Sequence, residues 1–183
     1  MEATATPTRE RILYATAELF RRQGYSGTGL KQVVAEAQAP FGSLYHHFPG
    51  GKQQLADEVI RAGGAFFQAL VTAIYDEEAT PEASVRAMFA GAAETLAATD
   101  FQDACPIATV ALEVASTNEL LRRATAEVFE QWTVALSERL GDRDRALAVL
   151  SALEGAFVLC RAQRTVEPMF AAGEMAAAHV AAV

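Results

Sequence analysis

The sequence has few of the residues that metal, disulfide or covalent chemistry requires. Only two cysteines, Cys105 and Cys160, occur among the 183 residues, both in apolar contexts and without the spacing of a metal site. A disulfide framework and a zinc centre are therefore not indicated, and a reducing cytoplasm is the expected compartment. No paired carboxylates, Ser-His-Asp set or glycine-rich dinucleotide fingerprint is visible. We expect no enzymatic activity, no cofactor and no bound metal.

Long apolar runs and an excess of basic residues are missing as well. No uninterrupted apolar run approaches the length of a membrane-spanning helix, and no secretory hydrophobic region is present, so a soluble protein without membrane contact is expected. The net charge of -8 argues, by itself, against a nucleic-acid partner. The charge is unevenly distributed, however. Residues 1–64 carry seven Lys or Arg against six Asp or Glu, whereas residues 65–183 carry eight against seventeen. A nearly neutral head on an acidic body is compatible with one face approaching DNA.

The most informative segment is Phe41-Gly42-Ser43-Leu44-Tyr45-His46-His47-Phe48. Leu44 and Phe48 are four residues apart, which predicts a short helix with one packed face and one face free for a ligand. Upstream, Thr28 is expected to cap a helix over 30–37, and Pro40 is well placed at a helix start. A helix, a three-residue turn over 38–40 and a second helix form the DNA-binding helix-turn-helix unit.

The rest of the chain predicts helices only. Their expected ranges are 8–23, 30–37, 41–47, 51–76, 81–98, 106–115, 117–140 and 143–164, with a short helix possible after Pro168. With 51% hydrophobic residues the chain is also able to bury a core. The predicted fold class is all-α.

These residues resemble those of the TetR family of bacterial transcriptional regulators. The first helix and the segment around the reading helix carry the resemblance at Ile12, Ala15, Leu19, Phe20, Gly24, Gly42, Leu44, Tyr45, Phe48, Lys52 and Leu55. Further downstream, 105–108 and 154–156 resemble the branch with C-terminal domains like those of LmrA and YxaF. The resemblance implies an N-terminal three-helix DNA-binding domain over 1–50 and a C-terminal helical bundle over 51–183 for ligand binding and dimerisation.

Two positions depart from the family pattern. Gln38 replaces a glycine that is usual in the turn, so a non-glycine residue is expected to adopt a positive backbone torsion there. Phe41 replaces a common lysine, which removes a phosphate or base contact. Phe41 could touch a thymine methyl or could instead belong to the core of the head.

The DNA-binding residues are expected in and around the predicted helix-turn-helix. Tyr45 and His46 would donate hydrogen bonds to phosphates, and the N-terminal residues of the reading helix would reach base edges. Lys52, with the backbone N–H groups of Gly50 and Gly51, is expected to hold a phosphate. The complete predicted set is Thr28, Lys31, Pro40, Phe41, Gly42, Ser43, Tyr45, His46 and Lys52.

Two further sets of residues are predicted in the body. The resemblance implies an inducer pocket in the bundle, and large apolar or isolated polar side chains are the candidates for its lining: Phe67, Leu70, Phe89, Ile107, Val110, Glu113, Phe129, Trp132, Thr133 and Phe157. A stripe at spacings of three and four, with small neighbours, predicts a dimer interface or intramolecular packing at Leu147, Leu150, Ser151, Glu154, Gly155, Val158 and Arg161.

The sequence therefore predicts a cytoplasmic homodimeric repressor that binds a palindromic double-stranded operator and is released by a hydrophobic small-molecule inducer. A second interpretation is a helical carrier or sequestering protein whose head does not bind DNA, which the acidic composition also allows. An enzyme built on the same bundle is the third interpretation. DNA retardation assays distinguish the first two interpretations.

Overall fold

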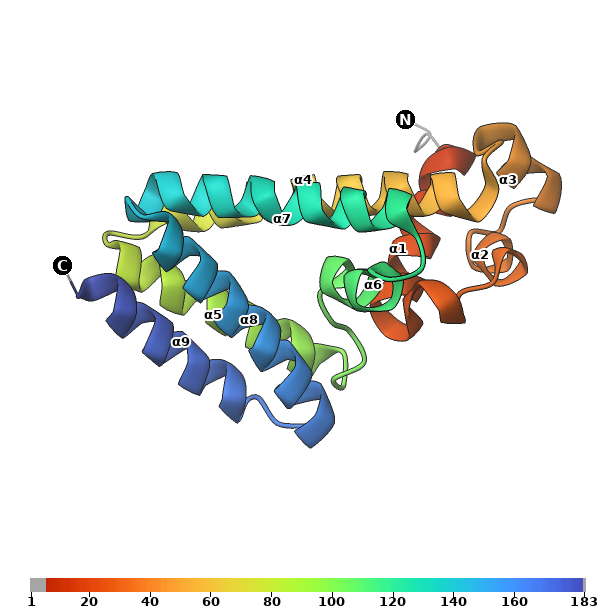
Figure 1. Cartoon of the computed structure of the whole chain (residues 1–183). Helices are drawn as coiled ribbons and strands as arrows, with labels where there is room; N and C mark the ends of the chain where they lie inside the picture. The colour runs from red at the N-terminus through yellow and green to blue at the C-terminus, as the bar shows by residue number, and fades with distance from the viewer. Residues whose placement is uncertain (1–5, 183) are drawn as a thin grey trace, which may run out of the picture. The chain divides into compact units, whose positions relative to one another are not determined.

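The computed structural model describes residues 6–182, and within that range it contains nine α-helices and no strand (Figure 1). The helices are α1 (Thr8–Gly27), α2 (Leu30–Glu36), α3 (Phe41–His47), α4 (Gly51–Glu77), α5 (Pro81–Ala98), α6 (Pro106–Val114), α7 (Glu119–Leu140), α8 (Arg143–Gln163) and α9 (Glu167–Ala181). The all-α prediction is confirmed. The last helix, α9, has 15 residues and is longer than the short helix expected after Pro168.

Local signals in the sequence explain several helix ends. Thr80 accepts a hydrogen bond from the Ala83 N–H at 3.2 Å and starts α5, and Asp142 accepts one from the Arg145 N–H at 2.9 Å and starts α8. Gly141 has φ +71°, a conformation that favours glycine, and it follows the last residue of α7. The predicted break at Gly24 is a kink within α1, where φ is +73°.

The chain forms two compact units. The head unit comprises the described residues up to Gly63 together with Pro106–Ala126, and the body unit comprises Gly64–Cys105 and the described residues from Glu127 onward. The helices α4 and α7 each contribute residues to both units. The head unit thus includes more of the chain than the DNA-binding domain 1–50 that the resemblance implies.

The core of the head unit is built from the apolar faces of its helices. Leu44 and Phe48, predicted to form the packed face of the reading helix, are fully buried. They share the interior of this unit with Ile12 and Phe20 of α1 and Leu55 of α4. Since these side chains alternate at helical spacing with exposed positions, burial fixes which face of α3 remains free.

In the body unit, α5, α8 and α9 pack against one another (Figure 1). A Cβ at Gly173 of α9 would lie 2.9 Å from the Cβ of Phe89, so the glycine permits close approach of α9 to α5. By length and composition alone, α8 could cross a membrane, a test that the core helix of a globular domain also passes. Its apolar residues include Val149 and Leu153, which are buried in this unit.

Candidate nucleic-acid interface

The turn between α2 and α3 has the backbone that the sequence predicts. Gln38 adopts φ +48°, the left-handed conformation expected from its replacement of a glycine. The Arg11 guanidinium donates hydrogen bonds to the carbonyl oxygens of Ala37 at 3.0 Å and Gln38 at 3.4 Å. These bonds help to hold the strained turn from α1. No local signal in the sequence indicates these two bonds, because Ala37 and Gln38 are more than twenty residues from Arg11.

The free face of α3 carries two exposed aromatic rings. Phe41 is 44% exposed and Tyr45 is 48% exposed, and their ring centroids lie 5.8 Å apart in an edge-to-face arrangement. Phe41 is therefore not a core residue of the head, which was the alternative left open by the sequence. Gly42 and His46 are also exposed, whereas Ser43 is half-buried. This face has the composition of a surface that touches a partner through apolar and neutral polar groups.

Thr28 occupies a different environment from the one predicted. Its side chain is 1% exposed, and its hydroxyl donates a 2.7 Å hydrogen bond to the carbonyl oxygen of Gly24. The N-cap of α2 is Gly29, without a side-chain cap hydrogen bond, so the capping prediction is wrong. Satisfying the carbonyl at the kink in α1 is the physical reason that the hydroxyl points inward. Among the other predicted DNA contacts, Lys31 and Pro40 are exposed.

The backbone N–H groups of Gly50 and Gly51, predicted to hold a phosphate, already have acceptors within the protein. The Gly50 N–H donates to Oε1 of Gln54 at 2.8 Å, and the Gly51 N–H donates to the Phe48 carbonyl at 2.8 Å. Both donors are therefore used within the head unit. Lys52 lies with its Nζ 4.3 Å from the centroid of the Tyr25 ring. Burial lowers the pKa of Lys52, and the nearby Glu113 carboxylate opposes this effect.

Ion pairs within the head unit engage several of its basic side chains. Arg9 pairs with Glu58 and also lies over the ring of Phe48. Arg21 and Arg22 both pair with Glu18 in α1. Because these guanidinium groups are already paired with carboxylates, the formal count of basic residues overstates the charge available to a phosphate.

The helix α6 is tied to the head by Glu113. Its carboxylate accepts a hydrogen bond from the Ser26 N–H at 2.7 Å, just before α2. The same carboxylate lies so close to Gly24 that a Cβ there would be 1.6 Å from Oε1. Glu113 was predicted to orient a ligand, but in the structure its partner is the backbone of the head unit. A sequence separation of 87 residues gave no local signal for this contact.

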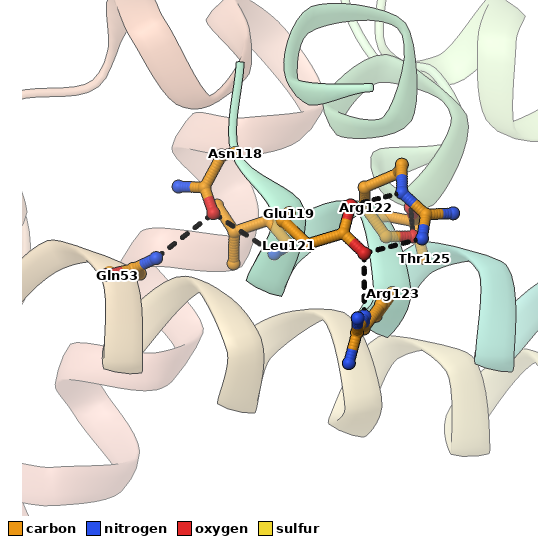
Figure 2. Close-up of polar contacts among 7 residues, drawn as sticks. All are labelled: Gln53, Asn118, Glu119, Leu121, Arg122, Arg123 and Thr125. Carbon is orange, nitrogen blue, oxygen red and sulfur yellow. Dashed lines mark hydrogen bonds and ion pairs between the residues drawn. The ribbon is translucent and has the colours of Figure 1, made fainter. Parts of the chain in front are cut away.

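The start of α7 is attached to α4 in the same unit (Figure 2). The Asn118 Oδ1 accepts hydrogen bonds from the Leu121 N–H at 3.2 Å and from Nε2 of Gln53 at 3.0 Å. Asn118 thereby satisfies a free N–H in the first turn of α7 and fixes this helix to the N-terminal part of α4. Glu119 binds both Arg122 and Arg123, and these bonds lower the pKa of its carboxyl to about 2.

The predicted ligand-binding residues fall into both units. Ile107 and Val110 are buried in the head unit, and the other seven besides Glu113 lie in the body unit. There, Trp132 is 3% exposed and packs against the rings of Phe67 and Phe129, at centroid distances of 4.3 and 5.5 Å. Its indole N–H donates a 2.9 Å hydrogen bond to the Gly64 carbonyl. The remaining members are Leu70, half-exposed; Phe89 and Thr133, buried; and Phe157, partly buried.

The predicted dimer residues of α8 divide into two groups. Leu147, Ser151, Gly155 and Val158 are exposed. The other three are engaged within the body unit: Leu150 is buried, Glu154 is hydrogen-bonded to Cys105, and Arg161 donates to the carbonyl oxygens of Phe101 and Gln102. Burial raises the pKa of Glu154 to about 7. The stripe read from the sequence thus contains both an intramolecular side and an unpartnered apolar side.

Comparison with known proteins gives consistent matches over most of the chain. Residues 12–59 match the family described as bacterial regulatory proteins, tetR family, and residues 81–175 match the C-terminal domain of LmrA/YxaF-like transcriptional regulators. The HTH-type transcriptional regulator LmrA of Bacillus subtilis is 30% identical over 88% of this chain and 90% of its own length. The uncharacterized regulator YxaF of the same organism is 36% identical over 72% of this chain and 69% of its own length.

Solved structures share the fold at lower sequence identity. The regulatory protein TetR from Rhodobacter sphaeroides superposes with a TM-score of 0.83 at 21% identity, covering 94% of this chain and 98% of that one. Reduced NemR from Escherichia coli gives a TM-score of 0.78 at 22% identity, covering 96% of each chain. The helical architecture is therefore that of known regulators with a helix-turn-helix head.

Proposed function

We propose, since this chain belongs to the TetR family of bacterial transcriptional regulators, that it is a cytoplasmic repressor that binds a palindromic operator as a homodimer. The observation that carries this proposal is the exposed face of α3, set by the Gln38 turn and the buried Leu44 and Phe48. Two such helices, one from each subunit, would enter major grooves one helical turn apart, about 34 Å.

The phosphate contacts are assigned to Tyr45 and Lys52. We expect the double substitution Tyr45→Ala and Lys52→Ala to weaken binding to all duplexes and to reduce the slope of log affinity against log salt by about one, because a phosphate contact releases counterions. Fluorescence anisotropy with DNA from upstream of its own gene measures both quantities. Arg86→Ala, which removes an exposed cation of α5 in the body unit, is the matched control. Wild-type affinity and slope in the double variant would contradict the assignment.

A hydrophobic inducer is the second part of the proposal. The aromatic cluster of Trp132, Phe67 and Phe129 supports an apolar or aromatic ligand in the body unit. Binding is reciprocal, so a ligand that lowers operator affinity about a hundredfold must bind about a hundredfold more weakly when operator is present. Titration of the Trp132 fluorescence with and without operator measures this coupling. Equal ligand affinities would contradict an inducer mechanism.

A further inference from the structure

The exposed side chains at the N-terminal end of α3 offer carbon surface rather than hydrogen-bond donors. Pro40 is exposed and has no backbone N–H, and Phe41 and Gly42, also exposed, have no polar side-chain atom. A Cβ at Gly42 would have no atom within 4 Å, so the backbone of α3 is open at this point. A surface of this kind cannot read the donor and acceptor pattern of a base pair through side-chain hydrogen bonds.

The aromatic ring of Phe41 is held in place although it is exposed. Tyr45, one helical turn later, packs against it edge-to-face at 5.8 Å. This geometry is a favourable one for two aromatic rings. The Phe41 ring therefore has a neighbour on one side, and 44% of the residue remains open to solvent. Because removing apolar surface from water is favourable, the exposed part of the Phe41 ring would gain by packing against another apolar group.

The major groove presents one apolar group at base edges, the C5-methyl of thymine. We propose that Phe41, supported by Tyr45, is a specificity-determining residue that recognises this methyl group in each operator half-site. The inference rests on the proposed function. A lysine, which is common at the position of Phe41 in the family, would contact a phosphate or a base. Phe41 would instead give a preference for thymine, the pyrimidine that carries the methyl group.

The test uses the full-length protein and an operator selected from random duplexes. Each thymine of the operator is replaced symmetrically by uracil, which removes only the C5-methyl group. At one position per half-site we expect affinity to fall about fourfold for each methyl lost, or roughly 15-fold for the pair, as the burial of one carbon group implies. In Phe41→Ala the thymine and uracil operators should bind equally.

Variants of the neighbouring ring distinguish its two roles. Tyr45→Phe keeps the ring but loses the hydroxyl, so it should weaken binding to both operators and leave the thymine-to-uracil ratio unchanged. Tyr45→Ala removes the support and should reduce that ratio. Tyr14→Ala, which deletes a 70% exposed aromatic ring of α1, should change neither quantity. Circular dichroism checks that each variant is folded.

The outcomes separate this inference from the function on which it rests. If no thymine in the operator shows more than a twofold effect, or if the ratio survives in Phe41→Ala, the assignment of Phe41 is overturned. If the selection yields no preferred duplex at all, the proposed operator binding fails instead.

Discussion

At the scale of single residues, the Glu154 carboxyl has a pH-dependent effect on stability. Among the described residues its Oε2 is buried without a hydrogen-bond partner, and burial raises the pKa of this carboxyl to about 7. The folded state thus binds a proton that the unfolded state releases near pH 4.5. Stability from this group is present below pH 4.5 and is lost as pH rises to about 7.

We therefore expect Glu154→Gln to stabilise the protein at pH 8 but not at pH 4.5. The expected gain at pH 8 is on the order of 2–3 kcal/mol in the free energy of unfolding, because the neutral amide avoids a buried charge. Urea unfolding at both pH values and one protein concentration measures the gain. The exposed Glu138 of α7 provides the control Glu138→Gln. A gain that is the same at both pH values would show that desolvation is not the cause.

At the scale of helices, the contact of α6 with α1 depends on Gly24 and Glu113 together. Gly24→Ala places a methyl group against the Glu113 carboxylate and adds strain at φ +73°. We expect it to lower the free energy of unfolding by about 2 kcal/mol or more. In a Glu113→Ala background the clash disappears, and only the backbone strain, about 1–2 kcal/mol, should remain.

A double-mutant cycle of chemical unfolding measures this coupling. Glu113→Ala alone should cost about 1 kcal/mol, since it removes one hydrogen bond from the Ser26 N–H. Strict additivity of the two substitutions would mean that the carboxylate moves away freely, and would contradict a close contact between these helices.

The same helices show which features could be predicted from sequence. Pro81 and Gly141 are local signals, and the helix ends beside them were predicted within a residue. The positive φ of Gln38 was predicted because its turn normally requires glycine. Thr28 also matched a local pattern, but its hydroxyl found an acceptor inside the unit. The contact of Glu113 with Ser26 depends on packing between distant segments, for which a single sequence contains no periodic signal.

At the scale of the whole molecule, the exposed side of α8 predicts the oligomeric state. A Cβ at Gly155 would have no atom within 4 Å, so a larger side chain fits the isolated subunit. We expect a dimer in sedimentation experiments, and expect Gly155→Leu to weaken it by about 1–3 kcal/mol through overpacking against the partner. Gly91→Leu is the matched control, because Gly91 of α5 is exposed and equally open. A monomeric wild type at micromolar concentration would contradict the dimer.

The head unit is formed by two separate stretches of chain, and this affects how it folds during synthesis. The helix-turn-helix is translated first. The second stretch of the unit, which contains α6 and the beginning of α7, ends at Ala126. Until Val114 leaves the ribosome, α6 is not available to cover the surface of α1 against which it packs. By then Gly64–Cys105 has already emerged, although its partners from Glu127 onward have not. A nascent chain that stops before Ala126 therefore carries α3 in an incomplete head unit.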